Sequence, residues 1–288
     1  MLPVTIALGL INFSLLINSF FGTLVNEEAP AAIDKAFRIY MLPQGIFSVA
    51  IATILFPTLS RLAARGEYDD LRRTMGNGIR QIFLLLIPSA VIMAVLAEPV
   101  TRLVYERGAF DAAATDLVAE AMFWWAFSLP FQGAGLLLSR TYFSLQRPWI
   151  TTALSGANLA VNALVALLLY EPLGVAGIVI GTVVATIGMT VAQAAFLRPD
   201  LGGIEAPRTA AAVARMLLAG AGLAVVSWLA WKGLDELLGR SLAAQIASLA
   251  GGIGAGLACY AAGVWALRVE EAHQIVRLVG ERFGRRPV

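Results

Sequence analysis

One arginine could bind an anion, because it lies beside an apolar stretch long enough to cross a membrane. Arg38 precedes the run Ile39–Leu59, which carries Pro43 and Gly45 near its start. A guanidinium can hold a phosphate or carboxylate through two parallel hydrogen bonds. Two alternatives stay open: Arg38 could snorkel to the interface, or pair with Asp34 one helical turn earlier. The sequence makes Arg38 the candidate substrate-binding residue.

A second group of candidates is uncharged and lies at membrane depth: Asn18, Asn158, Asn162 and Thr182. Asn158 and Asn162 are four residues apart, so they share one face of a helix. Their oxygens could coordinate a monovalent cation. The alternative is hydrogen bonding between helices, worth about 0.6–2 kcal/mol per contact. Because no carboxylate accompanies these oxygens, the sequence favours the hydrogen-bonding role.

The sequence lacks the residues that several kinds of chemistry require. His273 is the only histidine, which excludes histidine-based metal sites and a serine–histidine–aspartate triad within the membrane. The run Gly251–Gly256 lies inside an apolar stretch and lacks the lysine and hydroxyl residue of a phosphate-binding loop. We therefore expect Gly252 and Gly256 to serve close helix packing. No catalytic residue, metal site, cofactor or ATPase motif is predicted, so we do not expect an enzyme, and if the protein moves a substrate it does not hydrolyse ATP itself.

The composition indicates which elements must position these residues. The 288 residues are 59% hydrophobic and only 14% charged, and the mean hydropathy is +0.77. Soluble domains carry about 25% charged residues. We expect an all-α bundle of about eight transmembrane helices, since each crossing needs about 20 apolar residues. The expected spans are Leu2–Val25, Ile39–Leu59, Gln81–Val104, Leu117–Leu138, Trp149–Tyr170, Leu173–Leu197, Ala212–Trp231 and Ser241–Leu267.

The lysines and arginines divide unevenly between the two sets of loops. Fifteen fall in one set and six in the other, which places the first set and both termini in the cytoplasm. The segment Ser60–Arg80 alternates arginines with acids, so we predict an amphipathic helix on the inner leaflet. The tail from Arg268 to Val288 is either a similar helix or a solvated end. Nothing in the charge pattern points to nucleic acid.

Three stretches resemble one family of membrane transporters. The longest, Arg38–Ser60, matches a signature with proline, glycine, alanine, threonine and a second proline at fixed spacing. The others are Glu106–Phe110, expected on an outer loop, and Arg140–Pro148, expected on an inner loop. Together they resemble the MurJ (MviN) lipid II flippase family of the multidrug/oligosaccharidyl-lipid/polysaccharide exporter superfamily.

The resemblance implies an organisation. Family members have fourteen spans in two lobes, and the eight expected here resemble the last eight. Residues 1–208 would form a C-lobe-like bundle of six helices, 209–267 a pair of helices beside a lipid-facing groove, and 268–288 a basic cytoplasmic tail. The partner would be an N-terminal lobe of six spans, and the location a multi-pass position in the bacterial inner membrane.

The resemblance also implies a function. The cargo would be lipid II, an undecaprenyl-pyrophosphate-linked disaccharide peptide, carried from the inner to the outer leaflet by alternating access. Arg38 would be the cavity arginine that this chain retains. Phe37 and Met41 stand where some members have acids. Asn18 and Asn162 stand where some members bind a cation through aspartate, and this replacement weakens the coupling-cation expectation.

Two alternative functions stay open. A truncated or split relative could act as an inactive membrane scaffold, because six expected spans are missing. A related exporter could instead carry another lipid-linked oligosaccharide or a drug. The charge of the cavity discriminates between cargoes, because an anionic lipid pyrophosphate requires arginines and a cationic drug requires carboxylates.

Overall fold

The computed structural model describes residues 2–106, 110–239 and 241–274, and within these ranges the regular structure is helical throughout. The helices run in chain order as α1 (Leu2–Val25), α2 (Ala29–Pro43), η1 (Gln44–Ser48), α3 (Val49–Arg65), α4 (Tyr68–Val95), α5 (Ala97–Tyr105), α6 (Ala112–Ala126), α7 (Leu129–Ser144), α8 (Pro148–Leu197), α9 (Ala206–Leu238) and α10 (Leu242–Ala266). The expected all-α class is confirmed.

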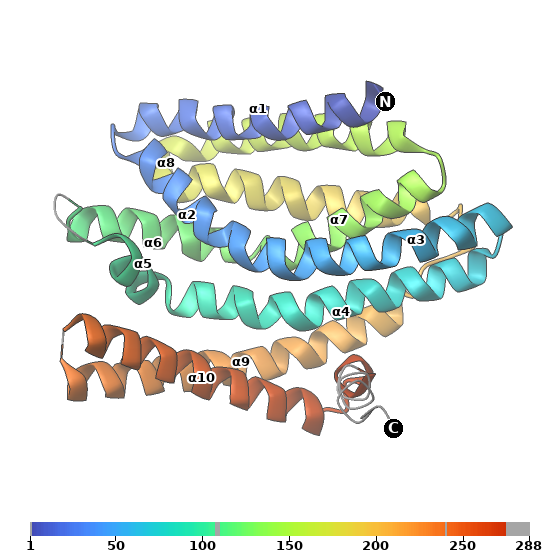
Figure 1. The fold of residues 1–288 in the computed structure, drawn as a ribbon. Helices are drawn as coiled ribbons and strands as arrows, with labels where there is room; N and C mark the ends of the chain where they lie inside the picture. Colours follow the sequence, from blue (N-terminus) through green and yellow to red (C-terminus); the bar gives the residue numbers. More distant parts are fainter. Residues whose placement is uncertain (1, 107–109, 240, 275–288) are drawn as a thin grey trace, which may run out of the picture.

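Many of these helices are long and apolar enough to cross a membrane. Among the described residues five helical stretches meet that test, and six do if the bent pair α6–α7 counts as one span. One of the five, α8, holds two of the expected spans. It reverses direction at Gly174, whose φ of 56° and ψ of −129° are not helical, and returns alongside itself (Figure 1). The structure is therefore that of a polytopic helical membrane bundle.

Three expected boundaries change in the structure. The stretch Gln81–Val104 is two helices, because α4 ends before Leu96, whose φ is −107°, and α5 follows. The stretch Leu117–Leu138 bends by 49° between α6 and α7, just before Pro130. The prediction of one amphipathic helix over Ser60–Arg80 is wrong. Gly66, whose φ of 70° suits glycine, caps the end of α3, and α4 starts two residues later.

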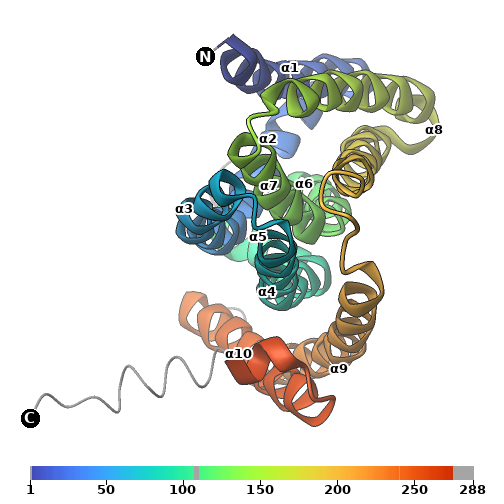
Figure 2. The ribbon, with the colours of Figure 1, turned by 90° about the vertical axis from the view of Figure 1, so that its right-hand side faces the viewer.

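The bundle has two hydrophobic cores that share α4 and α7. The larger core is built by the helices from α1 through α8, and the side chains of Trp125 and Tyr142 are fully buried in it. The smaller one packs α9 and α10 against α4 and α7 through Phe83, Met216 and Tyr260. Figures 1 and 2 show α9 and α10 as a separate layer on the far side of α4 from α1. The start of α1 and the end of α10 lie at the same end of the bundle (Figure 1), as an even number of crossings requires.

The glycines of α10 serve helix packing, as the sequence predicted. A Cβ at Gly252 would lie 3.0 Å from the carbonyl oxygen of Ser227, and one at Gly256 would lie 1.9 Å from the Ser227 Oγ. At these two positions α9 approaches closely only because α10 has no side chain there. The glycine-rich run is an interhelical contact.

The hairpin of α8 depends on a similar contact, which yields a first prediction. A Cβ at Gly177 would lie 2.1 Å from the carbonyl oxygen of Leu169, whereas one at Gly188 would meet nothing within 4 Å. Gly177→Ala should destabilise the fold by about 1–3 kcal/mol, because backbone must move to make room. Gly188→Ala, in the same helix, should be neutral or stabilising by up to about 1 kcal/mol. Thermal unfolding of both variants in one detergent checks this, and equal midpoints would contradict the close approach.

Candidate functional site

Arg38 lies on the exposed face of α2, and its side chain is 71% accessible. Its Nε donates a 2.9 Å hydrogen bond to Oδ2 of Asp34, one turn earlier. The pairing that the sequence left open as an alternative is therefore present. The described hydrogen bond uses only Nε, so the two terminal nitrogens of this exposed side chain remain available to a second anion. The arrangement can present two donors to a phosphate while one carboxylate fixes the side chain.

The opposite face of α2 explains why Arg38 points outward. Tyr40 is buried, and its hydroxyl accepts a 3.2 Å hydrogen bond from Oγ of Ser128 at the start of α7. The rings of Phe37 and Tyr40 pack on Trp125, with centroids 5.1 Å and 5.7 Å away. These aromatic contacts hold one side of α2 on α6, and Arg38 occupies the other side.

The helix that carries Arg38 is interrupted at membrane depth. Pro43 ends α2, and η1 is a five-residue π-helix that leads into α3. Proline removes a backbone donor, and a π-helix widens the turn, so the direction of the helix can change here. Gln44 and Ser48 are buried within η1 against the bundle. The break thus joins the segment bearing Arg38 to the rest of its span.

The structure brings together three of the four uncharged candidates. Nδ2 of Asn18 donates to Oγ1 of Thr182 at 3.1 Å, and Nδ2 of Asn162 donates to Oγ of Ser14 at 2.9 Å. Thr182 also lies 3.3 Å from Oδ1 of Asn162. Asn18 and Asn162 are 2% and 0% exposed. We name Ser14, Asn18, Asn162 and Thr182 the polar junction. It links α1 to both halves of α8.

Asn158 does not join the described hydrogen bonds of the polar junction, although it lies one turn from Asn162 and is half-buried. Within the junction the amide and hydroxyl groups serve one another as donors and acceptors. Hydrogen bonding of this kind is the role that the sequence favoured for them, because it needs no carboxylate. No group of three or more histidine, cysteine or acidic side chains that could hold a metal occurs in the described part of the chain.

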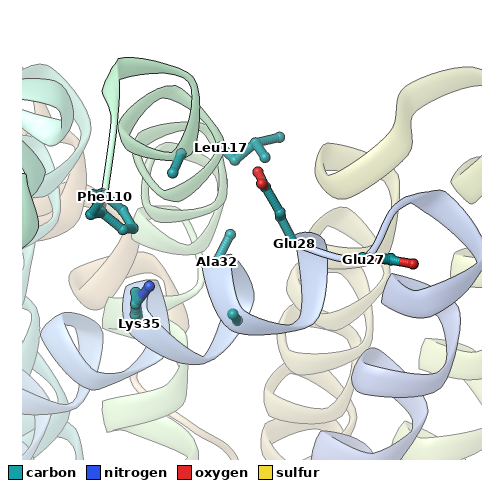
Figure 3. Close-up of a pocket in the computed structure, with 8 residues that line it drawn as sticks. Glu27, Glu28, Ala32, Lys35, Phe110 and Leu117 are labelled. Atoms are coloured by element: carbon teal, nitrogen blue, oxygen red, sulfur yellow. The ribbon is translucent and has the colours of Figure 1, made fainter. Parts of the chain in front are cut away.

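A cavity of about 250 Å³ opens at the end of the bundle where α1 turns into α2. Figure 3 shows Glu28 directed toward Leu117, and Lys35 directed toward Phe110. Nζ of Lys35 lies 4.2 Å from the centre of the Phe110 ring, which is a cation–π contact. The lining of the cavity carries two acids, Glu27 and Glu28, and one base, Lys35. Arg38 does not line it.

A buried charge cluster was not predicted. The sequence placed Arg80 among cytoplasmic loop arginines, but its side chain is only 3% exposed. Its Nε lies 2.5 Å from Oε1 of Glu271, and its Nη1 lies 2.8 Å from Oε2 of Glu205. Gly76, one turn before Arg80, makes room for Glu205, because a Cβ there would lie 2.9 Å from Oε2. This cluster fastens α4 to the residues before α9 and after α10.

A more exposed pair borders the cluster. Arg208 donates to Glu270, and this hydrogen bond with its positive charge lowers the pKa of that carboxyl below its ordinary value. Linear spacing could not find these partners, since Arg80 and Glu271 are 191 residues apart. The signal in the sequence was the presence of acids, Glu205, Glu270 and Glu271, in segments otherwise rich in arginine. Of the predicted tail, residues 275–288 lie outside the described part.

Comparison with known proteins decides the family. The family model "Lipid II flippase MurJ" matches residues 1–241. The chain belongs to this family. Its relatives include a probable lipid II flippase MurJ of Bdellovibrio bacteriovorus, 31% identical over 242 residues, which are 84% of this chain and 46% of that protein. A second, from Rhizobium meliloti, is 29% identical over 64% of this chain and 34% of its own length. The chain thus spans less than half of either relative.

Solved structures share the fold. One described as lipid II flippase MurJ in an inward closed conformation superposes with a TM-score of 0.71 at 17% identity, covering 92% of this chain and 54% of that one. A transporter from Pyrococcus furiosus that is described as a member of the MOP superfamily superposes with a TM-score of 0.55 at 14% identity, over 94% of this chain and 65% of its own. At these identities the MurJ likeness is evidence for the helical fold alone.

The buried cluster gives a second prediction. Arg80→Ala should destabilise the fold by about 3–5 kcal/mol, because it leaves Glu205 and Glu271 without their cation inside the structure. The matched control is Arg73→Ala, seven residues earlier on the same helix. Arg73 pairs with Asp70 at 3.7 Å while 69% exposed, so its loss should cost at most about 1 kcal/mol. Thermal unfolding in detergent measures both, and similar shifts would exclude a stabilising role for the cluster.

The polar junction gives a third prediction. Asn18→Ala should lower the free energy of unfolding by about 0.6–2 kcal/mol, because it removes hydrogen bonds between α1 and α8. Asn158→Ala should have a smaller effect, since Asn158 lies outside the junction. The same thermal assay compares the two variants. A larger loss from Asn158→Ala would show that the described contacts do not hold these helices together.

Proposed function

We propose that the chain supplies the C-terminal lobe of a flippase that moves lipid II from the inner to the outer leaflet of the bacterial inner membrane. The family assignment supports the cargo, and the chain's share of its relatives' length supports the lobe. The observation that carries the proposal is Arg38, which presents two unpaired guanidinium nitrogens beside a broken helix. This geometry suits a diphosphate better than it suits a neutral or cationic headgroup.

The mechanism follows from separating the headgroup from its tail. A sugar diphosphate cannot enter hydrocarbon, so it needs a hydrated, positively charged path. A polyprenyl tail can stay in lipid, alongside the layer formed by α9 and α10. Rocking of this lobe against an N-terminal lobe would expose the path to each side in turn. The π-helix at Gln44–Ser48 is the point where the span bearing Arg38 can bend.

A coupling cation, where the full assembly uses one, would meet the oxygens of Asn18, Asn162 and Thr182 first. These groups already bond to one another, and none is a carboxylate, so we propose structural linkage as their main role. If they bound sodium, the thermal midpoint would rise in sodium chloride relative to choline chloride at equal ionic strength. An inactive scaffold, or an exporter of another lipid-linked oligosaccharide, is the competing function.

The fourth prediction tests the flippase role. Bacteria depleted of their own flippase should grow when this chain is expressed together with a family N-terminal lobe, and should fail with either part alone. Arg38→Ala should abolish or strongly reduce growth, since the diphosphate loses its guanidinium. Arg102→Ala is the control, because Arg102 pairs with Glu98 on α5 and with Glu106 just after it. Full growth with Arg38→Ala at equal protein level would remove Arg38 from the substrate path, and no growth with any combination would favour the scaffold.

A further inference from the structure

Arg38 and Arg61 mark the two ends of one exposed helix face. Both side chains are exposed, and the residues between them on that face, among them Ile46 and Ile54, are exposed as well. The two arginines are 23 positions apart. At about 1.5 Å per residue this separation is at most about 35 Å along the helices, and the change of direction between α2 and α3 shortens it (Figure 1). Arg38 and Arg61 therefore lie on opposite sides of the break at η1.

A second arginine lies on α7, the helix that packs against this part of α3. Arg140 is half-buried on α7, and its Cζ lies 5.5 Å from the centre of the Phe56 ring of α3. One turn further along both helices, Oγ of Ser60 lies 3.2 Å from Oγ of Ser144. The seam between α3 and α7 thus offers a cation held over an aromatic ring and two hydroxyl groups next to it.

Arg61 and Arg140 form no ion pair in the described part of the chain, as is also true of Arg198, Arg215 and Arg268, whereas six other arginines at this end do. These six are Arg65, Arg72, Arg73, Arg80, Arg147 and Arg208. Within the described part of the chain, Arg61 donates only to the hydroxyl of Thr58 at 3.4 Å, and the contact of Arg140 is the Phe56 ring. Two unneutralised guanidiniums with adjacent hydroxyls are the donor set that binds phosphate groups.

We propose that Arg140 and Arg61, with the hydroxyls of Ser60 and Ser144, form an inner anion site that takes the diphosphate of a polyprenyl lipid. The inference rests on the proposed function for the identity of the ligand. The site is the loading position, and Arg38 is the position at the other end of the same face. Phe56 positions Arg140 by holding its guanidinium at the seam.

The fifth prediction tests this site by binding alone. The full chain, in bilayer discs of zwitterionic lipid, is titrated with a fluorescent polyprenyl diphosphate. Arg140→Gln and Arg61→Gln should each weaken binding about tenfold, since each removes charge-assisted hydrogen bonds. Arg140→Lys should bind with intermediate affinity, because it keeps the charge and loses the fork geometry. Inorganic pyrophosphate should compete with the probe.

The matched control is Arg73→Gln, which removes the same charge from the same end but at a residue paired with Asp70. It should change affinity less than twofold. An equal loss from Arg73→Gln would overturn the site in favour of general surface charge. Unchanged binding by Arg140→Gln, or no binding by the parent chain, would overturn it as well. Thermal midpoints of all variants establish that each remains folded.

Competition with anionic glycerophospholipid separates the two sources of lipid phosphate. We expect phosphatidylglycerol to leave the binding of the probe unchanged at equal concentration. If it competes as well as the diphosphate, the site is a contact for bulk membrane lipid and the proposal fails. Failure of the flippase role looks different, because growth complementation would then be absent while Arg140-dependent binding of the diphosphate persists.

Discussion

The structure depends on the cost of placing polar groups in hydrocarbon. A backbone in lipid has to hydrogen-bond to itself, so each crossing is a helix. A charged side chain there has to reach water or meet a partner. Each group at issue meets one of these conditions: Arg38 is exposed, Arg80 is enclosed by two glutamates, and the asparagines of the polar junction bond to one another. The positions of the polar residues follow from that cost.

Breaks in the helices place these groups without exposing backbone. Gly174 reverses α8 so that Asn162 and Thr182, twenty residues apart, meet on facing halves of the hairpin. Pro43 and η1 interrupt the span below Arg38 while Tyr40 and Phe37 keep the outer segment on α6. Each break touches protein on one side: a Cβ at Gly174 would lie 3.6 Å from Val25 of α1, and Gln44 and Ser48 of η1 are buried.

The layer of α9 and α10 is attached differently from the rest. Its own two helices meet through glycines. It meets the bundle through apolar contacts with α4 and α7 and through the Arg80 cluster at one end. A buried ion pair contributes little net stability compared with apolar packing, but removing one member is costly. The cluster therefore helps to fix where this layer sits against the bundle.

The sequence by itself determined the helical class, most of the spans, and the placement of both termini at one end of the bundle, because the length and apolar composition of a span are local properties. It also determined the family, because the Arg38–Ser60 signature is contiguous. It singled out Arg38, Asn18, Asn162 and Thr182 by the rarity of polar groups in apolar runs. Only the tertiary structure decided which of them meet, excluded Asn158 from the junction and turned Arg80 from a loop residue into a buried one. Those outcomes depend on partners up to 191 residues away, and no periodicity within a helix records which face of another helix will cover it.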